Sequence, residues 1–421
     1  MRISKYLNKI GIILLESDNN MKRNIIIKIL ILSLFIGIVI ISIINYNNYK
    51  VSNAKKIVEL EKNEIEVYDK VKLKDIIKNI NGKLENNVTI DTSKLGKQKI
   101  HFTYINDDSI KIPYQISVNV VDKTPPIIQS LSTYIIVKNT KTKKEFERSL
   151  FCGDNYDDKP SCRIEGDYSL SEIGNYNLTF IGEDKSKNIA KQSFTLKVVE
   201  KEEKKETKGK QSTTPLSSII KKYKTTNNKI GIDISHWQGK IDYKKVKKSG
   251  VEFVYIRVGR GDGIGKGAVL DDKFEEYIKG FEKEKIPIGI YFYSDANNDK
   301  NAKKEANWII DKIKKHKIDL EIVFDWENWS NYQEYQMSFH KLRTTANTFI
   351  NQIEKDGYKG MVYSSKYYLE NIWGGLNHKI WLAHYTEQTD YKGKYKVWQI
   401  CNNGEVPGIE NLTDIDIMYN N

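Results

Sequence analysis

Short apolar runs alternate with amphipathic stretches over residues 229–421, and this alternation constrains the fold more than any other feature of the sequence. The runs are rich in β-branched and aromatic residues, as buried strands are, and read KIGIDIS, EFVYIRV, PIGIYFYS, LEIVFDW, GMVYSS, KIWLAHY, YKVWQI and DIDIMY. Stretches between the earlier runs, such as DDKFEEYIKGFEKEK, have helical periodicity, whereas the later connections are too short for full helices. This pattern predicts a mainly parallel α/β fold, and eight runs favour an irregular (β/α) barrel, similar to a TIM barrel, over an open sheet.

A second constraint is the apolar segment at residues 25–44, IIIKILILSLFIGIVIISII. About 20 apolar residues are enough to cross a bilayer as a helix, so we expect a transmembrane anchor. Lys22 and Arg23 precede the segment, which predicts that residues 1–24 are cytoplasmic and that the rest of the chain lies outside the cell membrane, on the cell-wall side. A cleaved signal peptide is the alternative, although its apolar region would be shorter. Met21 would open a more ordinary anchor than Met1, so the true start stays open.

Two β-rich segments follow, and they repeat each other at a spacing of 78 residues. Gly96 and Phe102 correspond to Gly174 and Phe180, and both stretches alternate apolar and polar residues before ending in a valine pair. We therefore predict two small all-β sandwich domains at residues 50–122 and 123–200. The stretches DKTPP and GNYNLTF resemble bacterial immunoglobulin-like modules of cell-surface proteins. The resemblance implies a stalk, or weak binding to other envelope proteins.

Charge is distributed unevenly along the chain, whose net charge is +13. The basic excess lies in the first 50 residues and in a charge-dense, Ser/Thr-bearing segment at residues 201–228, which we interpret as a linker. Residues 231–421 carry equal numbers of acidic and basic side chains. A nucleic-acid enzyme would carry its positive charge near its site, so we expect no nucleic-acid partner.

The three cysteines fit an exported protein with one disulfide. Cys152 and Cys162 flank the turn-rich stretch GDNYDDKPS and could close a small loop, which leaves Cys401 without a partner. Three free thiols are the alternative. No Cys/His spacing predicts a zinc site, and we expect neither a metal nor a cofactor.

Carboxylates gather where the predicted barrel strands end. Asp233, Asp325 with Glu327, and Asp416 each lie in or just after such a run, and catalytic groups of α/β barrels sit at the carboxyl ends of strands. Asp325 and Glu327 are two residues apart and so share a face, while Trp326 points away and packs. Close carboxylates repel, so one tends to keep its proton, which suits glycoside hydrolysis. We expect Glu327 to hold the proton and Asp325 to stay ionised.

Aromatic rings near these runs could stack on sugar rings, although packing in the core explains each of them equally well. They are Trp237, Tyr291, Tyr293, Trp381 and Trp398.

Several of these motifs resemble glycoside hydrolase family 25, the peptidoglycan N-acetylmuramidases also called lysozymes of the Chalaropsis type. GIDISHWQGKIDYKKVKKSGVEFVYIRVG, IPIGIYFYS, EIVFDWEN, GMVYSS, IWLAHY, VWQI and DIDI occur in the family's order over residues 229–421. The resemblance implies cleavage of the β-1,4 bond between N-acetylmuramic acid and N-acetylglucosamine in peptidoglycan glycan strands. By motif, Glu327 resembles the general acid and Asp325 the partner that stabilises the attacking 2-acetamido group. Asp233 and Asp416 match the remaining site acids, and Gln399 of VWQI is expected to bind substrate.

Small departures from the family pattern, such as YFYS where a histidine is common, touch the subsites more than the acids. Chitinases of family 18 also end a strand in DWE, but their D-x-x-D-x-D-x-E pattern fails at Leu320 and Val323. Four acids could instead bind a divalent metal, but no calcium-loop spacing is present. A wall-binding protein that keeps the groove without turnover is the remaining alternative.

Overall fold

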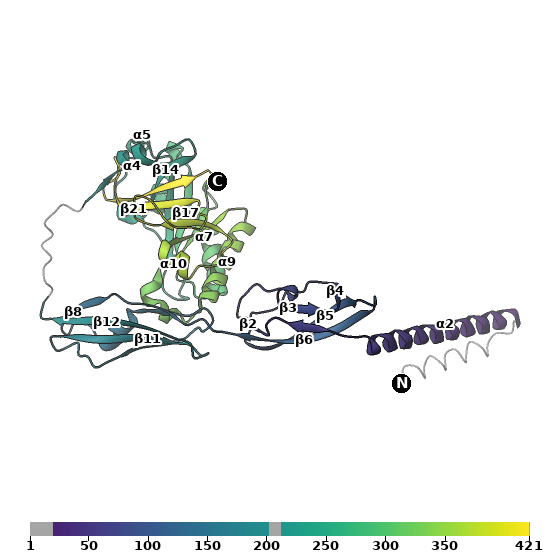
Figure 1. Ribbon diagram of the computed structural model, residues 1–421. Coiled ribbons are helices and arrows are strands. Elements are labelled where there is room, and N and C mark those ends of the chain that lie inside the picture. The colour runs from purple at the N-terminus through teal and green to yellow at the C-terminus, as the bar shows by residue number, and fades with distance from the viewer. Residues whose placement is uncertain (1–19, 202–211, 421) are drawn as a thin grey trace. The chain divides into compact units, whose positions relative to one another are not determined.

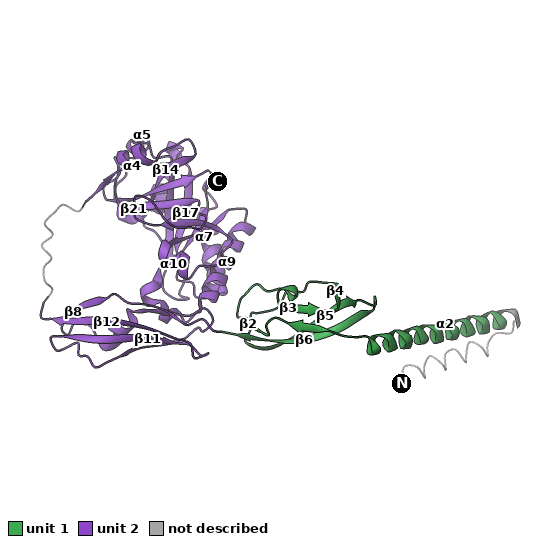
Figure 2. Cartoon of the chain, in the orientation of Figure 1, with its two compact units in different colours: residues 1–122 green, residues 123–421 purple. Residues whose placement is uncertain are grey.

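The computed structural model describes residues 20–201 and 212–420, which divide into two compact units, 1–122 and 123–421 (Figures 1 and 2). The first unit begins with helix α2 (Asn20–Asn53). Within the described part of the chain, this is the one helix long and apolar enough to cross a membrane, and its most apolar stretch is not buried by protein. The helix extends beyond the predicted span of residues 25–44 at both ends.

A β domain follows in the first unit. Its long hairpin, β5 and β6, pairs Gly96 with Val120 and Phe102 with Tyr114. Ile100, Phe102 and Tyr104 are buried because alternate side chains of β5 face the core, as the sequence pattern predicts. The strands are β1 (Val58–Leu60), β2 (Glu64–Glu66), β3 (Ile77–Ile80), β4 (Gly82–Leu84), β5 (Gly96–Asn106) and β6 (Lys111–Val121), in the sheets β2-β6-β5-β4 and β1-β3.

The second unit opens with another β module, residues 123–200. Its hairpin β11–β12 pairs Gly174 with Val198, the same register as the hairpin of the first unit, so the predicted repeat is a structural one. The predicted disulfide between Cys152 and Cys162 is confirmed. The elements are β7 (Ile127–Gln129), β8 (Thr133–Val137), α3 (Lys143–Arg148), β9 (Phe151–Gly153), β10 (Ser161–Glu165), β11 (Gly174–Glu183) and β12 (Ile189–Val199), in the sheets β10-β11-β12-β8 and β7-β9.

A closed sheet forms the rest of the second unit. Within residues 212–420, eight strands pair in the order β14-β15-β17-β18-β19-β20-β21-β22, and β22 pairs again with β14. Neighbours are parallel except that β22 runs antiparallel to both β21 and β14. Each predicted run overlaps one of these strands: β14 (Asn228–Ile234), β15 (Phe253–Gly261), β17 (Ile288–Tyr293), β18 (Ile322–Asp325), β19 (Gly360–Ser365), β20 (Lys379–Ala383), β21 (Val397–Glu405) and β22 (Thr413–Tyr419).

Helices cover the outside of this sheet between its earlier strands, whereas the last two connections, residues 384–396 and 406–412, contain no helix, as expected. Strand β18 shows how the two faces differ. Phe324 packs outward on Phe349 of α9, and Val323 and Asp325 face the interior. The helices are α5 (Tyr243–Lys248), α6 (Phe274–Glu284), α7 (Asp299–Ile313), α8 (Tyr332–Tyr335), α9 (Phe339–Lys355) and α10 (Lys366–Asn371); a short strand β16 (Ala268–Leu270) pairs with β15.

The predicted linker at residues 201–228 is too long. Strand β13 (Thr214–Pro215) pairs with β21, and helix α4 (Leu216–Tyr223) buries Leu216 and Ile219 against the closed sheet. The helix is only two turns long and lies in a Ser/Thr/Lys-rich context, so its apolar spacing was not recognised in the sequence. The folded C-terminal region therefore starts near Thr214 rather than at Lys229.

Candidate active site

A cavity of about 230 Å³ opens at the carboxyl ends of the parallel strands and gathers most of the predicted acids. It is lined by Asp233, Tyr291, Asp325, Glu327, Tyr363, Trp381, Tyr385, Gln399, Asn402 and Asp414. A larger hollow of about 1020 Å³ lies near the starts of β20 and β21, but no carboxylate lines it. Chemistry that depends on paired carboxyl groups therefore belongs to the smaller cavity.

Asp325 and Glu327 lie together in this cavity but differ in depth. Asp325 ends β18 and is 4% exposed, whereas Glu327 follows it at the mouth and is exposed to solvent. Burial raises the pKa of Asp325 well above its usual range, and the charge of Glu327 and a hydrogen bond between the two raise it further. Burial by the cavity walls also raises the pKa of Glu327, while the bond to Asp325 lowers it.

These pKa directions contradict the expectation that Asp325 stays ionised. Desolvation penalises the charge of both carboxyl groups, so the pair holds a proton more readily than an isolated carboxyl group does. The accessible carboxyl is that of Glu327.

Gln399 connects the second acid of the cavity to two tyrosines. Its Nε2 donates to Oδ2 of Asp233 at 2.8 Å, and its Oε1 accepts from the hydroxyls of Tyr363 and Tyr385, each at 2.9 Å. Burial, followed by repulsion from Asp414 and Asp416, raises the pKa of Asp233 well above its usual range. Gln399 thus fixes the orientation of a buried carboxyl group and two phenols at once.

Asp416 was expected in the site, but Asp414 takes that place. Asp416 is fully buried below the cavity, where it accepts from Nε1 of Trp381 at 2.8 Å. Asp414 lines the cavity, and burial raises its pKa to about 7. The reason is the direction of β22: because this strand is antiparallel to its neighbours, its beginning lies at the mouth. The prediction of Asp416 assumed instead that the carboxyl end of β22 lies at the mouth.

Only some of the aromatic residues predicted to contact sugars line the cavity. Tyr291 and Trp381 line the cavity with their rings edge to face at 6.1 Å, and Tyr293 adjoins the acids without lining it. Trp237 is exposed beside His236, outside the cavity. Trp398 was wrongly included: it faces the outer layer, where its Nε1 donates to the carbonyl of His384. The cavity is also lined by three residues that were not predicted because they lie outside any acid-rich motif, Tyr363, Tyr385 and Asn402.

Comparison with known families identifies this part of the chain. Residues 232–409 match the sequence profile of Glycosyl hydrolases family 25. Residues 232–409 are a family 25 glycosyl hydrolase domain.

Relatives of the family 25 domain include proteins named as lysozymes. An autolytic lysozyme of Clostridium acetobutylicum is 26% identical over 189 residues, which cover 44% of this chain and 54% of that protein. Lysozyme M1 of Streptomyces globisporus is 27% identical over 202 residues, or 44% of this chain and 65% of that one. A family 25 glycosyl hydrolase structure from Bacillus anthracis aligns with a TM-score of 0.41 and 22% identity, covering 47% of this chain and 92% of that chain. The chain thus matches about half to two thirds of these lysozymes' own length.

The tryptophans beside Glu327 hold the family 25 domain's acidic strand end in place. Trp326 is fully buried, as predicted, and donates from Nε1 to the carbonyl of Ala296 at 3.2 Å. Trp329 packs against Trp326 at 4.8 Å and stacks on Tyr368 at 3.8 Å. Neither ring lines the cavity, so both are structural.

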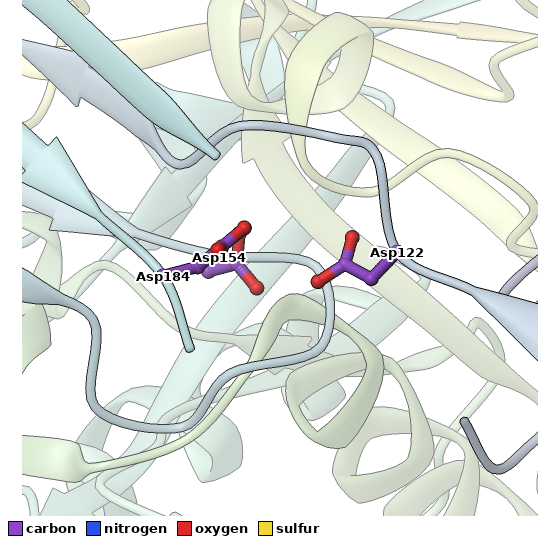
Figure 3. A group of neighbouring side chains, drawn as sticks. All are labelled: Asp122, Asp154 and Asp184. Carbon is purple, nitrogen blue, oxygen red and sulfur yellow. The ribbon is translucent and has the colours of Figure 1, made fainter. Parts of the chain in front are cut away.

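Outside the family 25 domain, two carboxylates have a spacing that the sequence did not reveal. Asp154 and Asp184 of the second β module are buried, and oxygens of the two lie within 4.8 Å of each other, close enough to share a cation (Figure 3). They are 30 residues apart in the chain, so no short motif marks them. Neither belongs to the catalytic cavity.

Proposed function

We propose that this chain is a membrane-anchored peptidoglycan hydrolase, an N-acetylmuramidase that cleaves the β-1,4 bond between N-acetylmuramic acid and N-acetylglucosamine. The observation that carries the proposal is the Asp325–Glu327 pair at the mouth of a closed sheet, where burial raises the pKa of both carboxyl groups. The family 25 profile and the lysozymes among the relatives support the same chemistry.

In the proposed mechanism, Glu327 is the general acid. Its carboxyl group is exposed at the cavity mouth, where a glycosidic oxygen can reach it, and Asp325 lies behind it as the proton reserve. When the acetamido N–H of the bound sugar donates to Asp325, the anionic form of Asp325 is stabilised, and the shared proton passes to Glu327. The raised pKa of Glu327 favours the protonated form that a general acid needs.

Bond cleavage then transfers the proton of Glu327 to the leaving oxygen as the bond to the anomeric carbon breaks. The acetamido oxygen attacks that carbon, and Asp325 stabilises the positive charge that develops on the acetamido group. A water molecule later displaces the acetamido oxygen and returns a proton to Glu327. Asp233 and Asp414 line the same cavity and place their carboxyl groups beside the developing cation.

Substrate binding is assigned to the side chains that line or adjoin the cavity. Tyr291 and Trp381 provide apolar faces, and the fixed amide of Gln399 positions Asp233 toward the sugar. Tyr293 and the exposed ring of Trp237 are proposed to contact sugars further along the strand. Trp398 and Asp416 have no such role.

We interpret the closed sheet as an irregular (β/α) barrel and the two small β regions as immunoglobulin-like. Helix α2 is interpreted as an uncleaved single-pass anchor with its N-terminal end cytoplasmic. Its apolar sequence supports this interpretation, as do Lys22 and Arg23 before it. A reporter fused after Glu200 should then be active only outside the cytoplasm, and protease resistance of that region in intact wall-less cells would contradict the orientation.

The enzymatic proposal is tested with the purified full chain in detergent on purified peptidoglycan. Wild type should release muropeptides that end in reducing N-acetylmuramic acid by mass analysis, and Glu327→Gln should sediment with the wall without releasing them. Wild type that sediments without any release would make the chain a wall-binding protein. Cleavage of chitin in place of peptidoglycan would make it a chitinase-like enzyme.

A further inference from the structure

The second β module contacts the family 25 domain directly behind the catalytic strand. Phe151, the first residue of β9, is 5% exposed because it enters an aromatic cluster of the other domain. Its ring lies 5.4 Å from that of Tyr332, 6.0 Å from Tyr368, and 6.2 Å from both Trp329 and Phe339. Gly153 lets the backbone come close, since a β-carbon there would lie 2.6 Å from the Phe339 ring.

Trp329 links this cluster to Glu327. Its backbone N–H donates to the carbonyl of Glu327 at 2.7 Å, and the short helix η3 (Asn328–Asn331) starts directly after that residue. The ring of Trp329 lies between Trp326 on the catalytic strand side and Phe151 of the β module. Packing around Phe151 therefore restricts the turn that presents Glu327.

A loop of the same β module caps helix α9. The carbonyl of Asp154 accepts from the N–H of Phe339 at 2.7 Å, and Oδ1 of Asp158 accepts from the N–H of Ser338 at 2.9 Å. The ammonium of Lys341 pairs with Asp158 as well. The first turn of α9 contains no acidic residue of its own, so Asp158 supplies the negative charge that favours a helix N-terminus. Helix α9 in turn supports β18 through Phe349 and Phe324 at 5.1 Å.

This capping loop is fixed within its own module. The Cys152–Cys162 disulfide closes it, and Oδ1 of Asp154 accepts hydrogen bonds from the N–H groups of Tyr156 and Asp157 at 2.8 and 2.6 Å. Asp157 pairs with the ammonium of Lys185 at 2.7 Å, which ties the loop to the turn between β11 and β12. The loop is therefore shaped before it meets the family 25 domain.

We propose that Phe151 and Asp158 of the second β module are positioning residues for Glu327, so that this module is a working part of the enzyme and more than a spacer. The inference rests on the proposed function. It also means that residues 229–421 alone would expose the aromatic cluster around Trp329 and would leave the N–H groups of Ser338 and Phe339 at the start of α9 without the acceptors that the module provides.

The test compares full-chain variants in detergent for peptidoglycan cleavage, well below their unfolding temperatures. Phe151→Ala should lower kcat by roughly 10-fold to 100-fold with a smaller change in KM, because small displacements of a catalytic group are costly. It should also move the alkaline limb of the pH profile to lower pH, since water reaching the turn would lower the pKa of Glu327. Phe151→Leu should recover most of the loss.

Matched controls separate positioning from general destabilisation. Phe102→Ala truncates a buried phenylalanine in the β domain of the first unit and should leave kcat unchanged. Asp158→Asn, which makes no cavity, should lower kcat about twofold to fivefold, while Asp167→Asn at an exposed site of the same module should not.

Folded Phe151→Ala and Asp158→Asn proteins with wild-type kcat and pH profile would overturn the inference. If Phe151→Ala fails to fold, Asp158→Asn decides alone. An inactive wild type would instead refute the proposed function, so the two failures are distinguishable.

Discussion

Each end of strand β18 has a buried carboxylate, and the two carboxylates differ in the charge of the groups that contact them. Glu321, just before the strand, is 1% exposed, and its Oε1 accepts from the ammonium groups of Lys379 at 2.8 Å and Lys396 at 2.6 Å. Its Oε2 accepts from the hydroxyl of Tyr255 at 3.1 Å. Asp325, at the other end, is almost as buried, but no cation bonds to it among the described residues, and its Oδ1 accepts no hydrogen bond there.

This difference separates an acid held by counter-charges from the acid that we propose to act in catalysis. A buried carboxylate with two lysines fastens β18 to β20 and β21 and has nothing left to offer a ligand. A buried carboxylate whose neighbour is another carboxylate keeps a proton that it can transfer. The sequence EIVFDWENW contains both kinds, and composition alone does not tell them apart.

The largest expected effect on turnover comes from changing Glu327 at the cavity mouth. Glu327→Gln should lower turnover of peptidoglycan by roughly 10²-fold to 10⁴-fold, the usual contribution of a general acid. An aryl glycoside with a good leaving group needs no proton, so it should recover part of the rate in Glu327→Gln and little in Asp325→Asn. Rescue in Asp325→Asn instead would reverse the two roles.

A change at Glu321, at the opposite end of β18, should lower the stability of the protein and leave kcat unchanged. Glu321→Gln leaves two lysines without their shared counter-charge and should lower the free energy of unfolding by about 2–4 kcal/mol, somewhat less than for a fully buried pair because both lysines are partly exposed. Denaturant titration measures this loss, and kcat of the folded fraction should match wild type. A large loss of kcat would remove the distinction between the two ends.

The disulfide should affect the end of β18 at the cavity mouth and not the end at Glu321. Reducing Cys152–Cys162 should lower the stability of the second β module by about 2–3 kcal/mol, because the closed loop is short. Because the same loop accepts hydrogen bonds from the N–H groups of Ser338 and Phe339 at the start of α9, kcat should fall as well. Activity with and without reductant checks this, with Cys152→Ser/Cys162→Ser as the matched variant; unchanged kcat would contradict it.

The smallest effect concerns Asp414, whose pKa is raised by burial to about 7. A raised pKa means that the folded state holds the proton more tightly than the unfolded state. The contribution of Asp414 to the free energy of unfolding is therefore greatest below pH 4 and declines as the pH rises through about 7. Asp414→Asn should therefore be about 1–2 kcal/mol more stable than wild type at pH 8, with the difference vanishing near pH 4. Thermal unfolding at the two pH values measures it, and equal differences at both would refute burial as the cause.

The sequence predicted the strands well because each apolar run is bounded by turn or helix signals, and because alternation fixed which side of β18 faces inward. It failed where strand direction mattered: an antiparallel β22 moves Asp414 to the mouth and Asp416 below it. The prediction also failed for Trp398. Trp398 and Gln399 are adjacent in β21, so their side chains point to opposite faces of the sheet, and only Gln399 faces the cavity. Contacts between distant segments, such as Phe151 with Trp329, leave no local pattern at all.

The burial of Cys401 has a consequence for how the protein matures in an oxidising compartment. Three cysteines allow three different disulfides, of which one is formed. Cys401 lies within β21, and burial raises the pKa of its thiol to about 11, so almost none of it is the reactive thiolate at neutral pH. Once the sheet has closed, Cys401 is withdrawn from thiol–disulfide exchange, which leaves Cys152 and Cys162 to pair with each other. Correct pairing is then decided by the order of folding, and it needs no isomerase to choose among the three thiols.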